Sequence, residues 1–412
     1  MKSTITRAFT VLATAALALM SVGATAQAAP PKVITIGTLY AGSGSFAASS
    51  QPEHSGLQFW VNQMNASGGV FVKAYGKKIH IKLVSYDDQS DTTTAATLYT
   101  QLITQDKVNL LVADFGSVLT SVAVPIAQEH KVLLFDPTGS GTSLFSSTNP
   151  YIVDTSIPTS GLWPTPLAHF LISKKIKKVA IIYAENDFTA SQATTLVNIL
   201  KAAHITPIAD KPVPTSTNDY TVLIRTIVAM HPQAVVELGY DANDISFFHN
   251  LAATQTHFPM LFTIYPGLET ALLEKTVGMS QLKYTYAYAS PPLLQYNKVN
   301  FGLGISNFLK RYTAATHQTA NFQTVAGYNT GLVIQKTLAT ASSLTQLDLR
   351  HAAGKASGHL STLEGMFQIQ ADGAQVGEQM YLAQFLPVHG KFQLSVVYPT
   401  AHATAKAVYP AP

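Results

Sequence analysis

The chain contains no cysteine. It therefore forms no disulfide bond, and its stability must come from a buried core. It also offers no cysteine for a lipid at a processed N-terminus. After the first 28 residues, no uncharged apolar run is long enough to cross a membrane. These absences predict a freely soluble protein, whose compartment is decided by its N-terminal segment.

The first 28 residues have the order of features that is typical of a secretory signal peptide. Lys2 and Arg7 form the positive start, and the apolar run 8–20 follows. Small residues then offer cleavage after Ala26 or Ala28. A buried N-terminal helix is the alternative, and it explains this order less well. We expect export, removal of residues 1–28 and retention in a bacterial periplasm.

Charged residues are scarce. The chain has 26 Lys and Arg against 22 Asp and Glu, which gives a formal net charge of +4. Removal of residues 1–28 takes away two positive charges and no negative ones, which lowers the net charge by two, to +2. A charge this small gives no support to a nucleic acid or another polyanion as the partner.

The signatures of common catalytic and cofactor sites are also absent. The sequence has no Gly-x-Ser-x-Gly elbow and no phosphate-binding P-loop. Its 13 histidines include no His-x-x-x-His pair, so we predict no metal and no other cofactor. Gly42-Ser-Gly44 followed by Ala47 fits only the loose form of a dinucleotide fingerprint. We therefore predict that the chain is not an enzyme; an enzyme with a two-lobed α/β cleft is the alternative.

Short β-rich runs alternate with longer helical patterns, which predicts βαβ units and mostly parallel sheets. Because the mature chain is too long for a typical single core, two domains are expected. The pattern fills residues 33–153 and restarts over 178–289. Expected strands are 33–39, 78–84, 108–113, 131–135, 178–183, 205–208, 234–238, 259–263, 366–370, 380–385 and 392–398. Expected helices are 53–65, 92–106, 190–203, 220–230, 244–254, 301–315 and 322–341.

Segments 149–166 and 289–294 are rich in residues that interrupt regular structure, and they are candidate hinges or linkers. The adjacent acids Asp87 and Asp88 could perform acid–base chemistry. We favour a structural role, in which they cap the helix expected from Thr92.

The segment from Asp114 to Ser121 joins an expected strand to a helical pattern that reaches His130. Ser117 stands at a possible N-cap, where free backbone N–H groups can bind a carboxylate. Pro125 is unfavourable inside a helix, so regular turns are expected to begin only near Ser121.

Four blocks together resemble the type I periplasmic solute-binding proteins of ABC importers, in the branched-chain amino acid and amide group. The first is 36–47, a strand and a loop. The second combines Asn65-Ala-Ser-Gly-Gly-Val70 with the acids 87–91. The third is the turn and helix 117–125, and the fourth is the strand 178–183. The likeness extends from about Ile34 to the C-terminus.

The resemblance implies an α/β fold of two Rossmann-like lobes with a ligand cleft between them, the periplasmic binding protein type I fold. It implies one lobe from 33–155 plus 290–377 and a second from 156–289 plus 378–412. The expected partners are a small-molecule ligand and an ABC permease in the inner membrane, with the chain acting as a monomer. Sensing, in which the same fold presents its ligand to a receptor or regulator, is the alternative to transport.

The resemblance also implies where the ligand binds. In the family's amino acid binders, two loops of the first lobe hold the α-carboxylate, and aromatic residues of the second lobe close the cleft. The matching residues here are Ser117, Thr138, Gly139, Ser140, Phe188, Tyr240 and Tyr265.

One departure affects the expected ligand. The amino acid binders carry an acid, which pairs with the ligand's ammonium group, where this chain has Tyr265-Pro266-Gly267. Asp241 or Asp136 could substitute for that acid. We therefore expect an amino acid, an amide, or an aromatic or aliphatic carboxylate as the ligand.

Overall fold

The first sheet is formed by strands from the N-terminal part of the chain. The structure is a computed structural model that describes residues 29–289, 294, 298–377 and 380–412. The strand order is β2-β3-β1-β4-β5-β6, and all neighbours are parallel except β2 and β3. The bounds are β1 (Val33–Tyr40), β2 (Val70–Val72), β3 (Lys77–Asp87), β4 (Leu110–Val112), β5 (Leu134–Asp136) and β6 (Ile152–Asp154).

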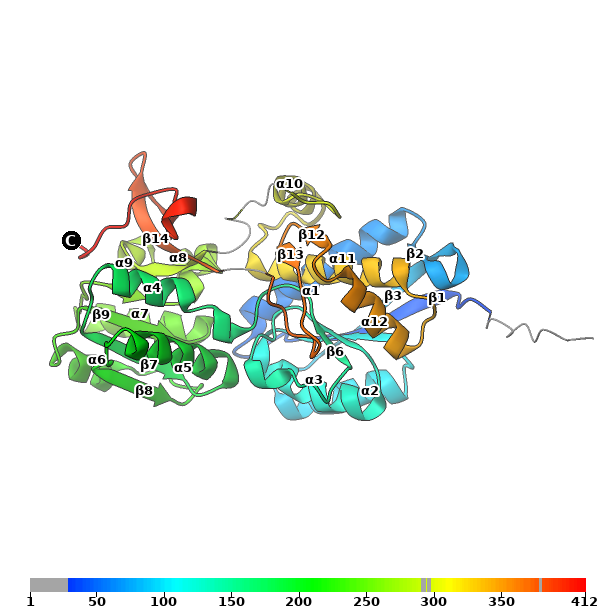
Figure 1. Ribbon diagram of the computed structural model, residues 1–412, viewed down its shortest axis with the longest axis horizontal. Helices are drawn as coiled ribbons and strands as arrows, with labels where there is room; N and C mark the ends of the chain where they lie inside the picture. Colours follow the sequence, from blue (N-terminus) through cyan, green and yellow to red (C-terminus); the bar gives the residue numbers. More distant parts are fainter. Residues whose placement is uncertain (1–28, 290–293, 295–297, 378–379) are drawn as a thin grey trace, which may run out of the picture. The chain divides into compact units, whose positions relative to one another are not determined.

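Helices cover both faces of this sheet, as Figure 1 shows with the blue, cyan and orange segments. One core contains apolar side chains of the strands together with those of α1, α11 and α12, and the other contains those of α2 and α3. The bounds are α1 (Ala47–Ala66), α2 (Thr92–Thr104), α3 (Gly116–His130), α10 (Ile305–Thr316), α11 (Phe322–Thr340) and α12 (Gln346–Ala356). A small antiparallel hairpin, β12 (Leu360–Thr362) and β13 (Gly365–Phe367), follows α12.

The second sheet has the order β15-β14-β11-β10-β9-β7-β8. Strands β7 to β11 pair in parallel, and β14 and β15 return along the edge of β11 in antiparallel pairing. The strand bounds are β7 (Val179–Ala184), β8 (Ala209–Val213), β9 (Ala234–Leu238), β10 (Leu261–Phe262), β11 (Tyr286–Ala289), β14 (Tyr381–Val388) and β15 (Lys391–Tyr398). The helices are α4 (Thr165–Ser173), α5 (Asp187–Ala202), α6 (Thr221–Val228), α7 (Asp241–Ala253), α8 (Thr270–Thr276) and α9 (Met279–Leu282).

Among the local predictions that are wrong, three concern β8, α3 and the cap of α2. The strand expected at 205–208 is β8, at Ala209–Val213, whose middle residues are exposed and so give no apolar run. Helix α3 is regular from Gly116 although Pro125 lies inside it. A proline removes one helical hydrogen bond, and burial of α3 residues on both sides of it, including Leu119 and Ala127, stabilises the helix.

The third concerns the acidic pair. Asp91 is the cap of α2, because its side chain accepts a hydrogen bond from the Thr94 amide at 2.7 Å. Asp87 instead links the end of β3 to the loop after β1, because its carboxylate accepts a hydrogen bond from the Gly42 amide at 2.7 Å. The side chain of Asp88 accepts from the Ser90 amide at 2.9 Å.

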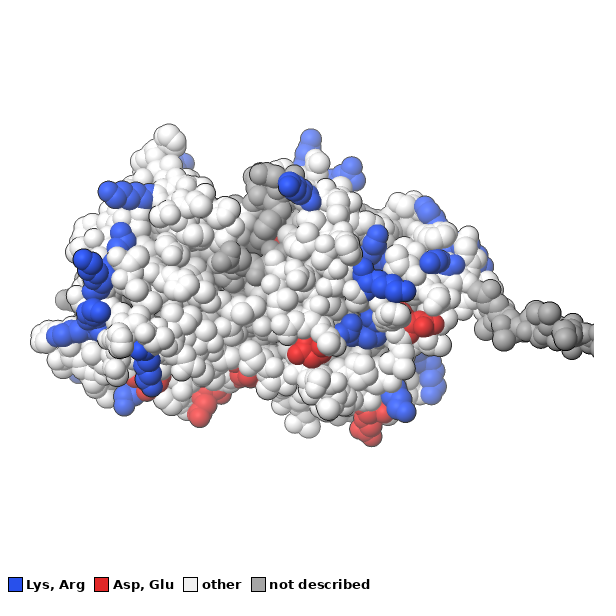
Figure 2. All heavy atoms as spheres, viewed as in Figure 1, with Lys and Arg blue, Asp and Glu red and all other residues white. Residues whose placement is uncertain are grey.

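Some predictions fall on parts of the chain that the structure does not describe. The expected signal peptide, 1–28, lies outside the described residues, as do Pro291 and Pro292 of the second candidate hinge. The first candidate hinge, 149–166, contains β6 and the start of α4. Within the described residues, no helix is both long and apolar enough to cross a membrane. On the face drawn in Figure 2, lysines and arginines are spread over the periphery, and the middle carries few charges.

Candidate functional site

The first wall of the candidate site is formed by the loops that follow β4 and β5. Gly116, at the start of α3, donates its amide hydrogen to the Thr138 hydroxyl at 3.0 Å. Thr138 in turn donates to a carboxyl oxygen of Glu53 at 2.5 Å. Ser117 accepts from the Gly141 amide at 2.8 Å. The two loops and α1 are thereby joined in one buried hydrogen-bond network.

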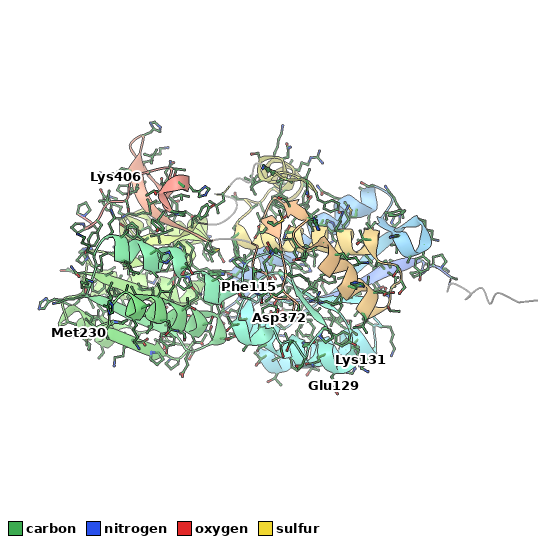
Figure 3. All side chains as sticks on the ribbon, viewed as in Figure 1. Phe115, Glu129, Lys131, Met230, Asp372 and Lys406 are labelled. Atoms are coloured by element: carbon green, nitrogen blue, oxygen red, sulfur yellow. The ribbon has the colours of Figure 1, made fainter. Side chains whose placement is uncertain are left out.

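Ser117 does not occupy the N-cap that the sequence suggested. The N-cap of α3 is Phe115, which makes no side-chain cap, and Ser117 is the second helical residue. Phe115 is labelled in Figure 3, where it lies at the start of α3. Because Gly116 adopts a positive φ of 75°, the chain turns into the helix one residue before Ser117.

Gly139 and Ser140 belong to the loop that follows β5, and their hydrogen bonds are made within the protein. The Gly139 amide donates to a carboxyl oxygen of Asp136 at 2.7 Å, and the Ser140 carbonyl accepts from the Ser160 amide at 2.7 Å. The Ser140 hydroxyl is buried and has no partner among the described residues. Burial raises the pKa of Asp136 to about 8, while the Gly139 and Thr138 amides lower it.

The hydroxyl of Ser117 is therefore a structural acceptor, and its removal should destabilise the fold. In Ser117→Ala the buried Gly141 amide loses its partner, which should lower the free energy of unfolding by about 1–3 kcal/mol. The matched control is Ser121→Ala on the same helix, where an exposed hydroxyl is removed and the change should stay within about 0.5 kcal/mol. Urea unfolding measures both, and equal losses would contradict the role given to Ser117.

The second wall consists of aromatic side chains that follow strands of the second sheet. Phe188 follows β7, Tyr240 follows β9 and Tyr265 follows β10. The ring of Tyr240 lies 5.3 Å from that of Phe188 and 6.2 Å from that of Tyr265, measured between centroids. Phe46, Phe115 and Trp163 extend the group. We call these six residues the aromatic cluster.

The two walls meet directly. The Ser117 amide donates to the hydroxyl oxygen of Tyr240 at 3.1 Å, although 123 residues separate the two in the sequence. Burial raises the pKa of Tyr240, so its side chain is a neutral phenol. Contact between α3 and the residue that begins α7 thus closes the space between the sheets.

A small cavity remains at this contact, with a volume of about 10 Å³. This is close to the minimum needed for one water molecule. Thr138, Phe188, Tyr240 and Tyr265 are among the predicted residues that line it, whereas Ser117, Gly139 and Ser140 are not. The other lining residues are Phe115, Gly116, Ile157, Trp163, Leu268 and Phe322.

Sequence reasoning missed an acidic residue beside the cavity. Glu269 is buried just after β10, four residues beyond Tyr265, and accepts hydrogen bonds from Ser49 and from the Gln323 amide, the latter at 2.6 Å. Burial raises the pKa of Glu269, and the charge of Asp241 raises it further. The sequence did contain this acid, since Glu269 lies close to Tyr265-Pro266-Gly267, the position where the amino acid binders carry the acid that pairs with the ligand's ammonium group.

The two acids named as substitutes lie in different places. Asp241, next to Tyr240, is buried, and burial raises its pKa to about 6. One of its oxygens, Oδ1, has no hydrogen-bond partner among the described residues. Asp136 is bound by backbone amides behind the first wall, as described above, and does not line the cavity.

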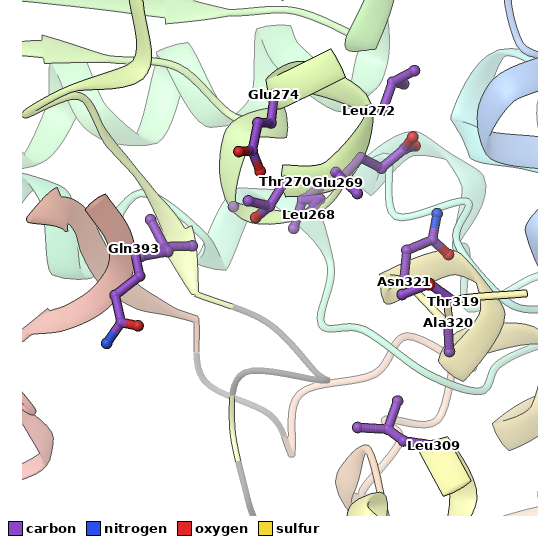
Figure 4. A pocket seen from close by; sticks show the side chains of 13 residues that line it. Leu268, Glu269, Thr270, Leu272, Glu274, Leu309, Thr319, Ala320, Asn321 and Gln393 are labelled. Carbon is purple, nitrogen blue, oxygen red and sulfur yellow. The ribbon is translucent and has the colours of Figure 1, made fainter. Parts of the chain in front are cut away.

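A larger cavity of about 580 Å³ lies on the other side of Leu268 and Glu269. Figure 4 shows it from close by, with Leu268, Glu269 and Thr270 on one side and Thr319, Ala320 and Asn321 on another. Leu268 lines both cavities and therefore separates them. Within the described part of the chain, no group of three or more His, Asp or Glu side chains is placed to hold a metal ion.

Comparison with known sequences identifies one protein family and several distant relatives. The sequence model of the family described as periplasmic binding protein matches residues 33–388. A Leu/Ile/Val-binding protein of Citrobacter freundii is 22% identical over 209 residues, which are 51% of this chain and 54% of that protein. A leucine-specific-binding protein of Salmonella typhimurium is 23% identical over 226 residues, 55% and 58% of the two chains. The matches thus span little more than half the length of these relatives.

Solved structures confirm the predicted fold class. A branched-chain amino acid transporter substrate-binding protein from Streptococcus pneumoniae, solved with isoleucine, has a TM-score of 0.73 at 20% identity and covers 89% of this chain and 100% of its own. An ABC transporter solute-binding protein from R. palustris, solved with benzoate, has a TM-score of 0.73 at 18% identity, with 92% and 98% covered. The fold is the two-sheet α/β fold of type I periplasmic binding proteins. The chain belongs to the periplasmic binding protein family.

Proposed function

We propose that this chain is the substrate-binding component of an ABC transporter and captures a small molecule between its two sheets. One observation carries the proposal: loops from both sheets converge on a single cavity, with a helix start on one side and aromatic rings on the other. Ligands of parallel α/β sheets bind outside the carboxyl ends of the strands, which is where these loops lie.

The proposed ligand-binding residues are Ser117, Thr138, Gly139, Ser140, Phe188, Tyr240 and Tyr265. The proposed ligand is an amino acid, an amide or a small carboxylate. Support comes from proteins of the same fold, which were solved with isoleucine and with benzoate. Thr138 and the three aromatic residues line the cavity, and the other three support its first wall.

Capture requires the two lobes to separate, since a cavity of about 10 Å³ admits no such ligand. We propose residues 33–155 plus 290–377 as one lobe and 156–289 plus 378–412 as the other. Hinge closure around a ligand is an established type of motion. Hydrogen bonds that join the two proposed lobes, such as Ser143 with Asp187 at 2.8 Å and Ser49 with Glu269, would form on closure.

The proposed setting is the bacterial periplasm. Export would follow from the signal peptide at 1–28, cleaved after Ala26 or Ala28, and the family's periplasmic members support this location. The mature monomer would then deliver its ligand to a permease in the inner membrane. Mass spectrometry of the exported protein would identify the new N-terminus.

A ligand screen tests the proposed function. A molecule that binds only the folded mature protein should stabilise it by RT ln(1 + [L]/Kd), about 2.7 kcal/mol at 100 times Kd. The measurement is a thermal shift of the mature protein with amino acids, amides, amines and carboxylates, with sugars and nucleotides as controls. Absence of a shift with every small molecule would overturn the proposal.

A further inference from the structure

Three backbone donors at the start of α3 are already engaged within the protein. The amides of Phe115, Gly116 and Ser117 would ordinarily form an anion-binding turn. Here they donate to Asp114 Oδ1 at 2.6 Å, to the Thr138 hydroxyl at 3.0 Å and to the Tyr240 hydroxyl at 3.1 Å. Only the last of these acceptors comes from the second lobe, so Tyr240 occupies the position that a ligand carboxylate oxygen would take.

Close packing keeps Tyr240 at this position. A side-chain carbon on Gly116 would lie only 3.2 Å from the Tyr240 hydroxyl and ring, so glycine permits the approach. Tyr240 also packs in the aromatic cluster, with ring contacts to Phe46, Phe188 and Tyr265. When the lobes are closed, the phenol is thus held against the amide by packing as well as by its hydrogen bond, and a ligand carboxylate would have to displace it from this position.

The surrounding charges also disfavour an anion. None of the lysines and arginines in the described residues is buried, so no cation lies at the walls of the cavity. The buried ionisable groups behind the first wall include the acids Glu53, Asp114 and Asp136. A carboxylate placed here would lack a charged partner, and burying an unpaired charge is costly.

The opposite end of the site offers acceptors that need donors. Gln323 and Asp241 are 0% and 2% exposed, and Gln323 Oε1 and Asp241 Oδ1 have no hydrogen-bond partner among the described residues. Each stands next in sequence to a residue that lines the cavity, Phe322 and Tyr240. A ligand with N–H groups would satisfy these oxygen atoms, and aromatic rings would cover its apolar part.

We infer that Tyr240 is a specificity-determining residue, which blocks carboxylates from the start of α3 and restricts the site to small apolar or aromatic amines and amides. This inference rests on the proposed function: of its ligand classes it keeps the amides, and it adds amines. It assigns the N–H end of the ligand to Asp241, Gln323 and Glu269. The hydroxyl of Tyr240 then acts as an internal substitute for the carboxylate that an amino acid would supply.

Matched ligands test the inference. The probes are benzamide, benzylamine and benzoate, together with leucinamide and leucine, titrated calorimetrically into the mature protein and into Tyr240→Phe. Removal of the hydroxyl frees the Ser117 amide, so affinity for benzoate and leucine should rise roughly ten- to hundredfold, the worth of one hydrogen bond to a charged group. In the unchanged protein, the amide or amine of each set should bind at least about tenfold tighter than the carboxylate.

Tyr286→Phe is the matched control. It removes a buried tyrosine hydroxyl that donates to the Val408 carbonyl at 2.8 Å, away from the residues that line the cavity. Its ratio of amide to carboxylate affinity should equal that of the unchanged protein. If Tyr240→Phe does not fold, the ratio measured in the unchanged protein decides the question.

The outcomes separate the two proposals. Preference for carboxylates in the unchanged protein, or an unaltered ratio in folded Tyr240→Phe, overturns the role of Tyr240 and leaves the proposed function standing. Carboxylate binding that appears only in Tyr240→Phe supports the role of Tyr240. If neither these probes nor the wider screen bind either protein, the proposed function is wrong, and the inference is wrong with it.

Discussion

Gly327→Ala should lower the free energy of unfolding by about 3 kcal/mol, because two helix backbones touch at this residue. A side-chain carbon on Gly327 of α11 would lie 1.9 Å from the carbonyl oxygen of Glu53 on α1. Gly56 of α1 makes the reciprocal approach, 2.0 Å from the Thr324 carbonyl oxygen. Neither obstacle is a flexible side chain, so the helices must move apart. Alanine's higher helix propensity, about 1 kcal/mol, offsets only part of this cost.

Gly354→Ala is the matched control, with an effect of opposite sign. Gly354 lies in α12, where an added carbon would meet only the end of the Arg350 side chain at 3.5 Å. Without a clash, the substitution should stabilise the protein by about 0.5–1 kcal/mol. Urea unfolding of both variants measures the difference. A Gly327→Ala variant as stable as the unchanged protein would contradict the helix contact described above.

The second expected result concerns pH. Stability should fall as pH rises from about 5 to about 8, and Glu364→Gln should remove a large part of that fall. Glu364 is buried between β12 and β13, and burial raises its pKa from the ordinary 4.5 to about 8, although a hydrogen bond from Ser156 lowers it. Below pH 4.5 the group is protonated in both states. Above it, the unfolded chain releases the proton first, so stability is lost until the folded group ionises near pH 8.

The size of the effect follows from the interval between the two pKa values. Each pKa unit corresponds to about 1.4 kcal/mol, so the interval of about 3.5 units makes Glu364 alone account for roughly 5 kcal/mol, most of it between pH 5 and pH 8. Asp136 and Asp244, whose pKa values burial raises to about 8 and about 7, act in the same direction. Glutamine keeps the shape of the protonated acid and does not ionise, which makes the variant relatively more stable at pH 8.

The measurement is urea unfolding at pH 5 and pH 8. Glu129→Gln is the control, since Glu129 is exposed near the end of α3, where Figure 3 labels it, and its replacement should leave the pH dependence unchanged. If Glu364→Gln and the unchanged protein lose the same free energy between these two pH values, Glu364 is not protonated in the folded state at pH 5.

Buried periodic segments were predictable from the sequence, and exposed or polar ones were not. Strand β9 has the predicted bounds, 234–238, because every residue in it is apolar or buried. Strand β8 was misplaced because it is an edge strand with polar residues, held by backbone pairing with β7. Helix α12 was missed for a related reason, since much of its surface is polar and exposed.

For the candidate site, the sequence indicated which loops matter but not which atoms meet. The resemblance to the family grouped Thr138 with Phe188, Tyr240 and Tyr265, although Thr138 follows a strand of the first sheet and the other three follow strands of the second. The hydrogen bond between Ser117 and Tyr240 joins residues 123 positions apart, and that between Ser49 and Glu269 joins residues 220 positions apart. Such contacts depend on how two sheets face each other, which no local pattern records.

The near absence of free volume at the aromatic cluster has a consequence for how affinity is set. With a cavity of about 10 Å³, only the population of open molecules can accept a ligand on the proposed function. The apparent dissociation constant is then the intrinsic constant divided by the open fraction. Substitutions that never touch the ligand, for example at Ser143 or Asp187, would tune affinity by changing that fraction. Evolution could thus adjust the working concentration range of such a protein while its selectivity stays constant.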